Sequence, residues 1–282
     1  MLRFAANLTM MYTEVPFRER FAVAARDGFR AVEYMFPYEH PAAQIAALLA
    51  QYGLEQALFN ASAGNWAAGE RGFASLPGRE EEFHLSIYQA LEYAQFLNCP
   101  RIHAMAGIAP KGVAREKLLA TYTANIAWAA EEAEKAGCEL LIEPINSRDM
   151  PGYFLNTQDE AHRIVGLIGK ENLKVLLDLY HVANVEGNVA SEVRRSFAAD
   201  RASKIGHIQI AGFPGRHEPD TGELNYKKDI FPLLEEFDYT GWIGLEYRPL
   251  SGTTAGLGWM HHLPPAVGPA AFGVTMPPRA AR

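Results

Sequence analysis

The order of apolar and polar positions divides the chain into short apolar runs that alternate with longer amphipathic stretches. Eight of the runs have the length of a β-strand and carry apolar residues on both faces, which is typical of parallel strands covered on both sides. These runs span residues 2–8, 31–36, 54–60, 101–107, 140–146, 173–179, 204–212 and 241–247. The pattern predicts the parallel sheet of an α/β protein.

The stretches between the runs carry helix start and stop signals. We expect helices over residues 17–29, 79–98, 115–137 and 157–169. Gly28 is placed to end the first of them, because glycine readily adopts the left-handed conformation found there. Thr157 followed by Glu160 is a capping-box pattern at the start of the last.

The number of these elements favours a closed (β/α)8 barrel over an open doubly wound sheet. An open sheet often has a glycine-rich phosphate loop after its first strand, whereas here the sequence TMMYTEVPF follows, without glycine. Barrels of about 250 residues are commonly single domains. We therefore expect residues 1–262 to form one (β/α)8 TIM barrel. Residues 263–282 are rich in Pro, Gly and Ala and are expected to form a disordered tail.

Composition narrows the class of protein. The chain has 282 residues, of which 49% are hydrophobic and 21% charged, and its net charge is −7. These values are normal for a globular protein and argue against a nucleic-acid partner, which usually requires a basic surface. Cys99 and Cys138 are the two cysteines and form no CxxC motif. The N-terminus shows no basic region followed by an apolar stretch of signal length, and no apolar run approaches roughly 18 residues, so we expect a cytoplasmic protein without a membrane partner.

Candidate chemistry lies at the ends of the predicted strands, where (β/α)8 barrels place their catalytic residues. Glu143, Asp178 and Glu246 end the fifth, sixth and eighth runs. Three acids at one barrel mouth would repel one another without a counterion. Oxygen ligands favour a hard cation such as Mg²⁺ or Mn²⁺. On the seventh run, His207 and Gln209 face the same side, and either is a candidate ligand.

Three further polar residues have open interpretations. His181 follows Asp178 by three residues and is a candidate hydrogen-bond donor to a substrate, or a local helix-start residue. His103 is interpreted as a core histidine. Glu33 either lines the barrel or pairs with a nearby arginine.

Several segments together resemble the hydroxypyruvate isomerase family of the xylose isomerase-like barrel superfamily. They are LRFAANLTMM (2–11), GFRAVEYMFPY (28–38), NWAAGERG (65–72), PGREEEF (77–83), LLIEPIN (140–146), PGYFL (151–155), LDLYH (177–181), KIGHIQIA (204–211), TGELNY (221–226) and GWIGLEYRP (241–249). NWAAGERG is the most discriminating, because barrel periodicity does not require it. The resemblance extends to about Met260, and it departs from the family at Arg248, where the family commonly has Lys, and in the C-terminal tail.

The resemblance implies an isomerase of the aldose–ketose type that interconverts hydroxypyruvate and tartronate semialdehyde through a cis-enediolate. It also implies that Glu143, Asp178, Gln209 and Glu246 hold a divalent metal, with Glu143 and Glu246 as the proton-transfer pair. More distant sugar epimerases carry a histidine at the position of Gln209, which favours Gln209 over His207 as the ligand.

A hydroxy-keto acid substrate carries a carboxylate, and the planar guanidinium of arginine suits such a group. Arg71 is the first choice for this contact, and Arg216 and Arg248 are the other candidates. Trp66 and Glu70 share the loop of Arg71 and are candidate substrate-binding residues, as is His181.

Other functions stay open at this point. A 2-oxo-tetronate isomerase or a ketose 3-epimerase would use the same barrel. A DNA-repair endonuclease would need a multi-histidine zinc cluster and a basic face. A binding protein that has lost catalysis is a further alternative, and a homo-oligomer is possible.

Overall fold

Eight parallel strands close into a barrel in the computed structural model, which describes residues 2–262. Each strand pairs with its neighbours in sequence, and β1 pairs with β8. The strands are β1 (Arg3–Asn7), β2 (Ala31–Tyr34), β3 (Glu55–Asn60), β4 (Arg101–His103), β5 (Glu139–Ile142), β6 (Leu173–Asp178), β7 (Ile205–Ile210) and β8 (Trp242–Leu245). The predicted (β/α)8 barrel is therefore confirmed, while the predicted tail, 263–282, lies outside the described residues.

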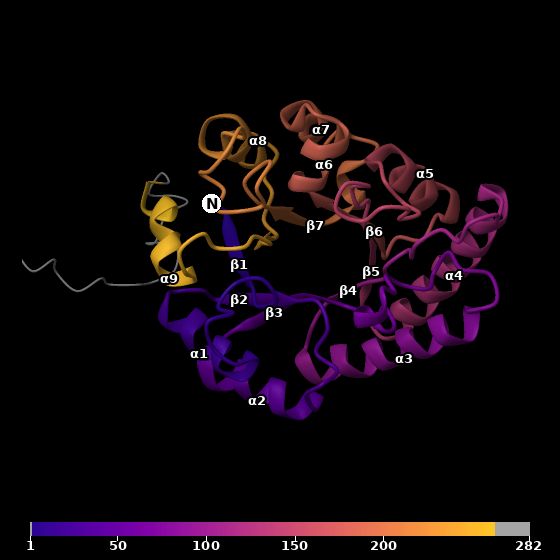
Figure 1. The fold of residues 1–282 in the computed structure, drawn as a ribbon, viewed down its shortest axis with the longest axis horizontal. Coiled ribbons are helices and arrows are strands. Elements are labelled where there is room, and N and C mark those ends of the chain that lie inside the picture. The colour runs from indigo at the N-terminus through magenta and orange to yellow at the C-terminus, as the bar shows by residue number, and fades with distance from the viewer. Residues whose placement is uncertain (1, 263–282) are drawn as a thin grey trace, which may run out of the picture.

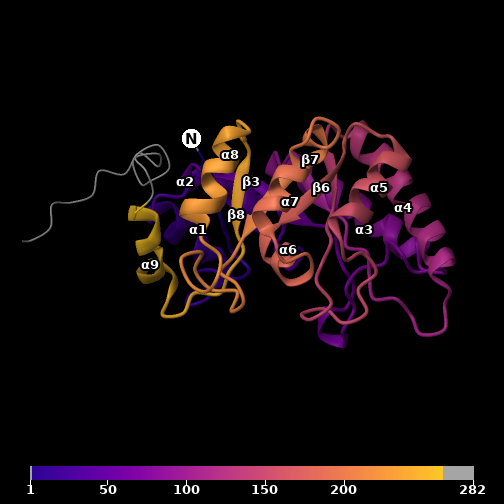
Figure 2. The ribbon, with the colours of Figure 1, turned by 90° about the horizontal axis from the view of Figure 1, so that it is seen from above.

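Helices surround the strands, as the end-on view of Figure 1 and the turned view of Figure 2 show. They are α1 (Phe17–Arg26), α2 (Ala42–Tyr52), α3 (Glu80–Leu97), α4 (Arg115–Lys135), α5 (Gln158–Ile168), α6 (Leu179–Val185), α7 (Val189–Ser196), α8 (Phe231–Glu236) and α9 (Thr253–Gly256). The Thr157 hydroxyl accepts a hydrogen bond from the Glu160 amide, so the predicted cap of α5 is confirmed. Within residues 2–262, no helix has the length and hydropathy needed to cross a bilayer.

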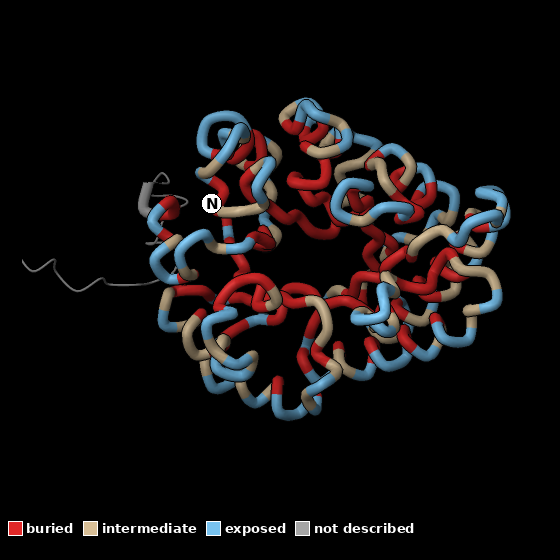
Figure 3. Tube along the Cα trace, in the orientation of Figure 1, coloured by how far each residue is buried: buried red, intermediate tan, exposed pale blue. Residues whose placement is uncertain are grey.

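Alternate residues of each strand face the barrel interior, and the others pack against the helices. The strands are buried and the outer helix faces exposed, as Figure 3 shows. Two small apolar clusters fill the interior: Leu58, Leu141 and Leu176 form one, and Ala5, Ala31, Ala57 and Trp242 form the other. Towards the C-terminal ends of the strands, the interior positions carry polar side chains instead.

The Glu33 carboxylate forms the centre of a buried polar network inside the barrel. Its Oε1 accepts hydrogen bonds from Asn7 Nδ2 at 3.0 Å and Gln209 Nε2 at 2.7 Å. Its Oε2 lies 2.7 Å from His207 Nε2. Glu33 on β2 thus reaches across the barrel to β7, and its partners are these residues rather than an arginine. Gly244 on β8 leaves the space that the carboxylate occupies.

Replacing Gly244 with alanine should destabilise the barrel, because the new methyl group would overlap the Glu33 carboxylate. A Cβ built on Gly244 lies 2.3 Å from Glu33 Oε2 and 2.4 Å from Oε1. Overpacking a core commonly costs about 1–3 kcal/mol, and we expect urea unfolding to show a loss of that size. Gly258→Ala is the matched control, since nothing lies within 4 Å of its built Cβ. Equal losses in the two variants would contradict this account.

Candidate active site

Four buried side chains meet at the C-terminal mouth of the barrel. Glu143 follows β5, Asp178 ends β6, His181 lies in the first turns of α6, and Glu246 follows β8. One ligand atom from each of the four lies within 4.8 Å of those of the others. The structure thus brings together the three acids that the sequence predicted to converge.

Burial and mutual repulsion disfavour the charged forms of the two glutamates. Burial, the largest cause, raises the pKa of Glu246 to about 8, and the neighbouring Asp178 adds to this while Arg216 opposes it. Burial also raises the pKa of Glu143 well above its ordinary value, with Glu246 and Asp178 as further causes. The cluster is therefore short of positive charge.

Arg216, one of the predicted substrate-binding residues, supplies part of that charge. Its Nη2 donates a hydrogen bond to Glu246 Oε2 at 2.6 Å and lies 3.6 Å from Asp178 Oδ2. Its Nη1 lies 3.5 Å from Asp149 Oδ2, and the guanidinium lies over the Tyr180 ring. The Nε atom is buried and has no hydrogen-bond partner. Arg216 therefore keeps one buried donor free.

Three acceptor oxygens in the site also have no donor: Glu143 Oε1, Asp178 Oδ2 and Gln209 Oε1. Glu33 binds the amide nitrogen of Gln209, which leaves the Gln209 oxygen as the free atom. Buried oxygens without partners are unfavourable, and a hard divalent cation is bound by such carboxylate and amide oxygens. These residues could therefore hold Mg²⁺ or Mn²⁺. The His207 ring instead faces Glu33.

Two histidines adjoin the acids and are kept neutral by burial. Burial lowers the pKa of His103 to about 3 and that of His181 to about 4. His103 Nδ1 lies 3.5 Å from Glu143 Oε2, so this residue is buried, as expected, but borders the site. His181 Nε2 lies 3.6 Å from Glu143 Oε1 and 3.5 Å from Asp178 Oδ2.

The loop between β3 and α3 holds three other predicted substrate-binding residues. The Arg71 guanidinium lies 3.8 Å from the centre of the Trp66 ring and donates to the carbonyls of Trp66 and Glu70. Glu70 accepts from the Asn65 amide and pairs with Arg79. In the part of the chain that the structure describes, these contacts stay within the loop and do not reach the three acids. A role for the loop in binding substrate stays a prediction.

Sequence reasoning missed several residues of the site. Tyr180 and Asp149 contact Arg216, and Asn146 contacts His181. Tyr180 and Asn146 stand two and three residues after a predicted acid, which is the one signal that could have found them. Arg248, a candidate for the substrate carboxylate, is exposed.

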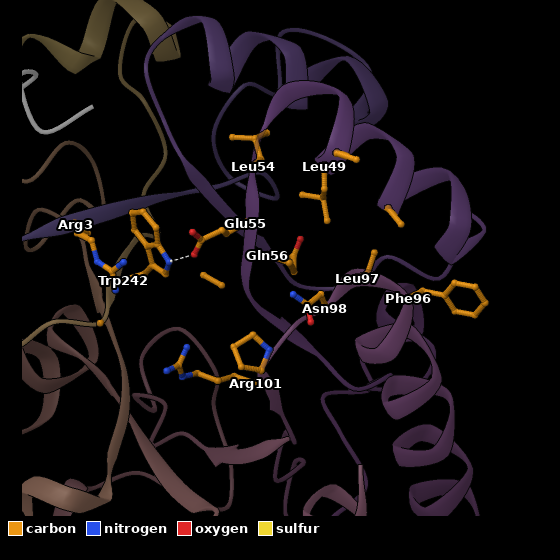
Figure 4. A pocket seen from close by; sticks show the side chains of 15 residues that line it. Arg3, Leu49, Leu54, Glu55, Gln56, Phe96, Leu97, Asn98, Arg101 and Trp242 are labelled. Carbon is orange, nitrogen blue, oxygen red and sulfur yellow. Dashed lines mark hydrogen bonds between the residues drawn. The ribbon is translucent and has the colours of Figure 1, made fainter. Parts of the chain in front are cut away.

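A hollow of about 570 Å³ lies at the opposite, N-terminal end of the barrel. Two of its polar side chains pair with each other: Trp242 Nε1 donates to Glu55 Oε2 at 3.0 Å, as Figure 4 shows. The Arg3 guanidinium lies over the Trp242 ring, and Arg101 Nε lies 2.9 Å from Glu139 Oε2. This hollow lies away from the acids, so we place the candidate active site at the C-terminal mouth.

The barrel with its acidic mouth has known relatives. Residues 21–263 match the model of the xylose isomerase-like TIM barrel family. The chain belongs to this family. It is 57% identical to the 2-oxo-tetronate isomerase of Cupriavidus necator and 44% identical to the hydroxypyruvate isomerase of Escherichia coli, each over 92% of this chain and 98% of the relative. The resemblance to hydroxypyruvate isomerases is thus confirmed, and this family member is an isomerase of that type.

Solved structures of similar proteins agree with the fold. A crystal structure described as AP endonuclease, family 2, from Brucella melitensis has a TM-score of 0.88 and 45% identity, over 92% of this chain and 98% of that chain. A 3-keto-D-glucoside 4-epimerase from E. coli has a TM-score of 0.74 and 18% identity, over 92% and 98%. The second comparison supports the fold alone.

In EDTA, the free energy of unfolding should fall as pH rises from 6.5 to about 8. Folded Glu246 keeps its proton up to a pKa of about 8, whereas in the unfolded chain it titrates near 4.5. The folded state therefore binds more protons in this window, and stability falls with rising pH. The buried, neutral His103 and His181 make the free energy of unfolding rise with pH, but only below the histidine pKa of about 6.5 in the unfolded chain.

The measurement is urea unfolding at several pH values in that window. Glu246→Gln should flatten the slope by up to about 1.4 kcal/mol per pH unit, the value for one proton. Glu116→Gln, at an exposed position at the start of α4, should leave the slope as it is. An unchanged slope in Glu246→Gln would show that the folded-state pKa of this group is not raised.

Proposed function

We propose that this isomerase interconverts a 2-oxo-3-hydroxy acid and its 3-oxo-2-hydroxy isomer, with hydroxypyruvate and tartronate semialdehyde as the three-carbon pair. The observation that carries the proposal is the pair of buried glutamates, Glu143 and Glu246, beside the unpartnered oxygens of Asp178 and Gln209. The names of the relatives support the reaction type.

The reaction moves a carbonyl group from C2 to C3. A base removes a proton from C3 of hydroxypyruvate, and the electron pair forms the C2–C3 double bond of a cis-enediolate. An acid then returns a proton to C2, the hydroxyl proton passes from the C3 oxygen to the C2 oxygen, and the C3 oxygen becomes the aldehyde oxygen. Glu143 and Glu246 fit the base and the acid, because raised pKa values place carboxyl groups nearer the working pH. Either glutamate can serve as base in a given direction.

Glu143, Asp178, Gln209 and Glu246 would hold the divalent cation through their carboxylate and amide oxygens. When bound, Mg²⁺ or Mn²⁺ supplies polarisation of the substrate carbonyl and stabilises negative charge on oxygen. The fit rests on the three unpartnered oxygens and on the raised pKa values of the glutamates, which show that the cluster lacks positive charge.

Arg216 is the candidate for the substrate carboxylate that the geometry favours. It is buried beside the acids and its Nε is unpartnered, whereas Arg71 already donates to two carbonyls and stacks on Trp66. A free, buried donor binds a carboxylate strongly, because water does not compete for it. The sequence ranked Arg71 first, so variants of both arginines are needed to decide which one binds the carboxylate.

A four-carbon acid is the second candidate substrate. The observation that favours it is the identity of 57% to a 2-oxo-tetronate isomerase, against 44% to a hydroxypyruvate isomerase. The two acids share the carboxylate, the C2 oxo group and the C3 hydroxyl, and differ by a hydroxymethyl group on C3. The same residues would therefore perform the same proton transfers on either one.

The site does not favour an endonuclease, although one similar crystal structure carries that name. Among residues 2–262, the candidate metal group contains three acids and one histidine rather than a histidine cluster. The net charge of −7 would also repel a nucleic acid. An uncharged ketose, the substrate class of a 3-epimerase, would leave the free Arg216 donor without a carboxylate.

Replacing either glutamate with glutamine should stop proton transfer while preserving the fold. Losing a positioned acid or base typically costs about 10²–10⁴-fold in rate, and we expect kcat for hydroxypyruvate to fall by at least that range in Glu143→Gln and in Glu246→Gln. The double variant should be little worse than the poorer single one, since groups that act as a unit are not additive.

Solvent-deuterium exchange into hydroxypyruvate, followed by NMR, tests the same step directly. Wild type with Mg²⁺ should exchange, and both EDTA and the glutamine variants should suppress the exchange. Near wild-type turnover in Glu246→Gln would overturn the two-carboxylate mechanism. Exchange that persists in EDTA would overturn the role of the cation.

Arg216→Lys should weaken binding of acids more than binding of uncharged ketoses. A hydrogen bond to a charged group contributes about 1.5–3 kcal/mol, so we expect KM for hydroxypyruvate to rise by about tenfold or more. Dihydroxyacetone, in which a hydroxymethyl group replaces the carboxylate, is the matched substrate and should show a much smaller change.

Arg71→Lys is the matched variant, because it makes the same change at the other candidate arginine. A larger acid-specific rise in Arg71→Lys would place the carboxylate contact on the loop between β3 and α3. Wild type should prefer either acid to dihydroxyacetone in kcat/KM, and comparing hydroxypyruvate with 2-oxo-tetronate decides the chain length. A preference for the uncharged ketose would contradict the proposal that the substrate is an acid.

A further inference from the structure

A buried amide contacts the site histidine from the side that faces away from the acids. Asn146 lies in the loop after β5, three residues beyond Glu143, and His181 lies in α6. Asn146 Nδ2 is 2.7 Å from His181 Nδ1, and both residues are almost fully buried, at 1% and 4% exposure. The contact links the loop after β5 to helix α6, which follows β6.

The orientation of the Asn146 amide is fixed by its own loop. Asn146 Oδ1 accepts hydrogen bonds from the backbone amides of Arg148 at 3.0 Å and Asp149 at 2.8 Å. Two donors on one atom identify that atom as the oxygen, so the NH₂ group must face His181. The backbone N–H of Asn146 also points at His181 Nδ1, at 3.5 Å.

His181 Nδ1 therefore faces N–H donors and must be the unprotonated nitrogen of the ring. A neutral imidazole carries its proton on the other nitrogen, here Nε2. The carboxylate oxygens nearest to Nε2, on Glu143 and Asp178, lie 3.6 and 3.5 Å away, longer than an ordinary N–H···O hydrogen bond. The Nε2–H group thus points into the site and is available to a ligand.

We propose that Asn146 is a positioning residue that fixes His181 as the Nε2–H tautomer, so that His181 donates a hydrogen bond to the substrate oxygen that gains negative charge. The catalytic half of this inference rests on the proposed isomerisation. A protonated Nε2 has no lone pair for a cation, so His181 acts as a donor. The free oxygen of Gln209, and not His181, then completes the ligand set with the three acids.

A neutral imidazole can polarise a carbonyl group when its N–H is correctly placed. Removing one donor aimed at a developing oxyanion typically lowers kcat by about 10²–10³-fold. A wrong tautomer has the same effect as a missing donor, because the bare nitrogen then faces the oxygen with a lone pair. The expected consequence of disturbing Asn146 is a loss in kcat that exceeds any change in KM.

The first test reads the tautomer without substrate. ¹⁵N NMR of histidine-labelled protein with saturating Mg²⁺, at about pH 8.5 and thus well above the ordinary histidine pKa of about 6.5, distinguishes bare from protonated ring nitrogens. The His181 signals are assigned as those lost in His181→Gln. We expect wild-type His181 to show a bare Nδ1 and a protonated Nε2. Any other state in wild type overturns the inference, and this result depends on no variant that could misfold.

The second test uses Asn146→Asp, which keeps the size of the side chain and its oxygen acceptor for the loop. A carboxylate oxygen then faces Nδ1 and draws the proton to it, which leaves Nε2 bare. We expect the ¹⁵N signals of His181 to reverse and kcat to fall by about 10²–10³-fold, with a much smaller change in KM. Asn188→Asp is the matched control: it adds the same charge at an exposed helix cap, whose role Asp can also fill. Asn188→Asp should leave both the ¹⁵N signals of His181 and kcat unchanged.

The His181→Gln background separates a tautomer effect from general damage. Glutamine offers an N–H donor and has no tautomers, so adding Asn146→Asp to it should lower kcat little further. A full loss in that background, a protonated Nε2 in Asn146→Asp, or reversed signals with unchanged kcat would each overturn the proposal. If wild type turns over none of the hydroxy-keto acids, the proposed function fails, while the ¹⁵N signals still decide whether Asn146 sets the tautomer.

Discussion

The crowding of buried negative charge at the barrel mouth is the constraint on which the rest of the site depends. Glu143, Asp178 and Glu246 are each at most 8% exposed, and their ligand atoms lie within a few ångströms of one another. Water cannot stabilise such charges, so the protein must supply compensation. Arg216 supplies one positive charge, and the pKa values of the two glutamates remain raised despite it. The remaining deficit of positive charge makes the site suitable for a divalent cation.

The interior of the barrel supports this mouth through a polar layer directly beneath it. Glu33 holds Gln209 by the amide nitrogen and His207 by Nε2, and thereby leaves the Gln209 oxygen as the free atom. The layer exists because Gly244 leaves room for the carboxylate. An apolar layer would pack as well but would leave the Gln209 amide free to rotate. The polar network therefore orients a ligand in addition to filling the core.

The sequence predicts the features that depend on local patterns, and it misses the contacts that join residues distant along the chain. Strand periodicity and the rule that barrel catalysis occurs at strand ends are local, and they place Glu143, Asp178 and Glu246 correctly. Gln209 required the family resemblance, because periodicity puts His207 on the same face. The partners of Glu33 and the burial of Arg216 depend on how distant loops and strands meet. No local pattern encodes those contacts, so the sequence ranked Arg71 first and left Glu33 undecided.

Charge balance connects the neutral histidine to the choice of substrate. If all three acids are ionised, their charge exceeds that of the single guanidinium by two, a difference that a divalent cation would cancel, so a monoanionic acid would enter a site without net repulsion. An imidazolium at His181 would compete with the cation for Glu143 and Asp178, which lie 3.6 and 3.5 Å from its Nε2. A neutral ring held in one tautomer avoids that competition and still provides an N–H donor. Asn146 controls which ring nitrogen carries the proton and does not change the charge of the ring. The site thereby gains an N–H donor without altering the charge balance that binds the cation.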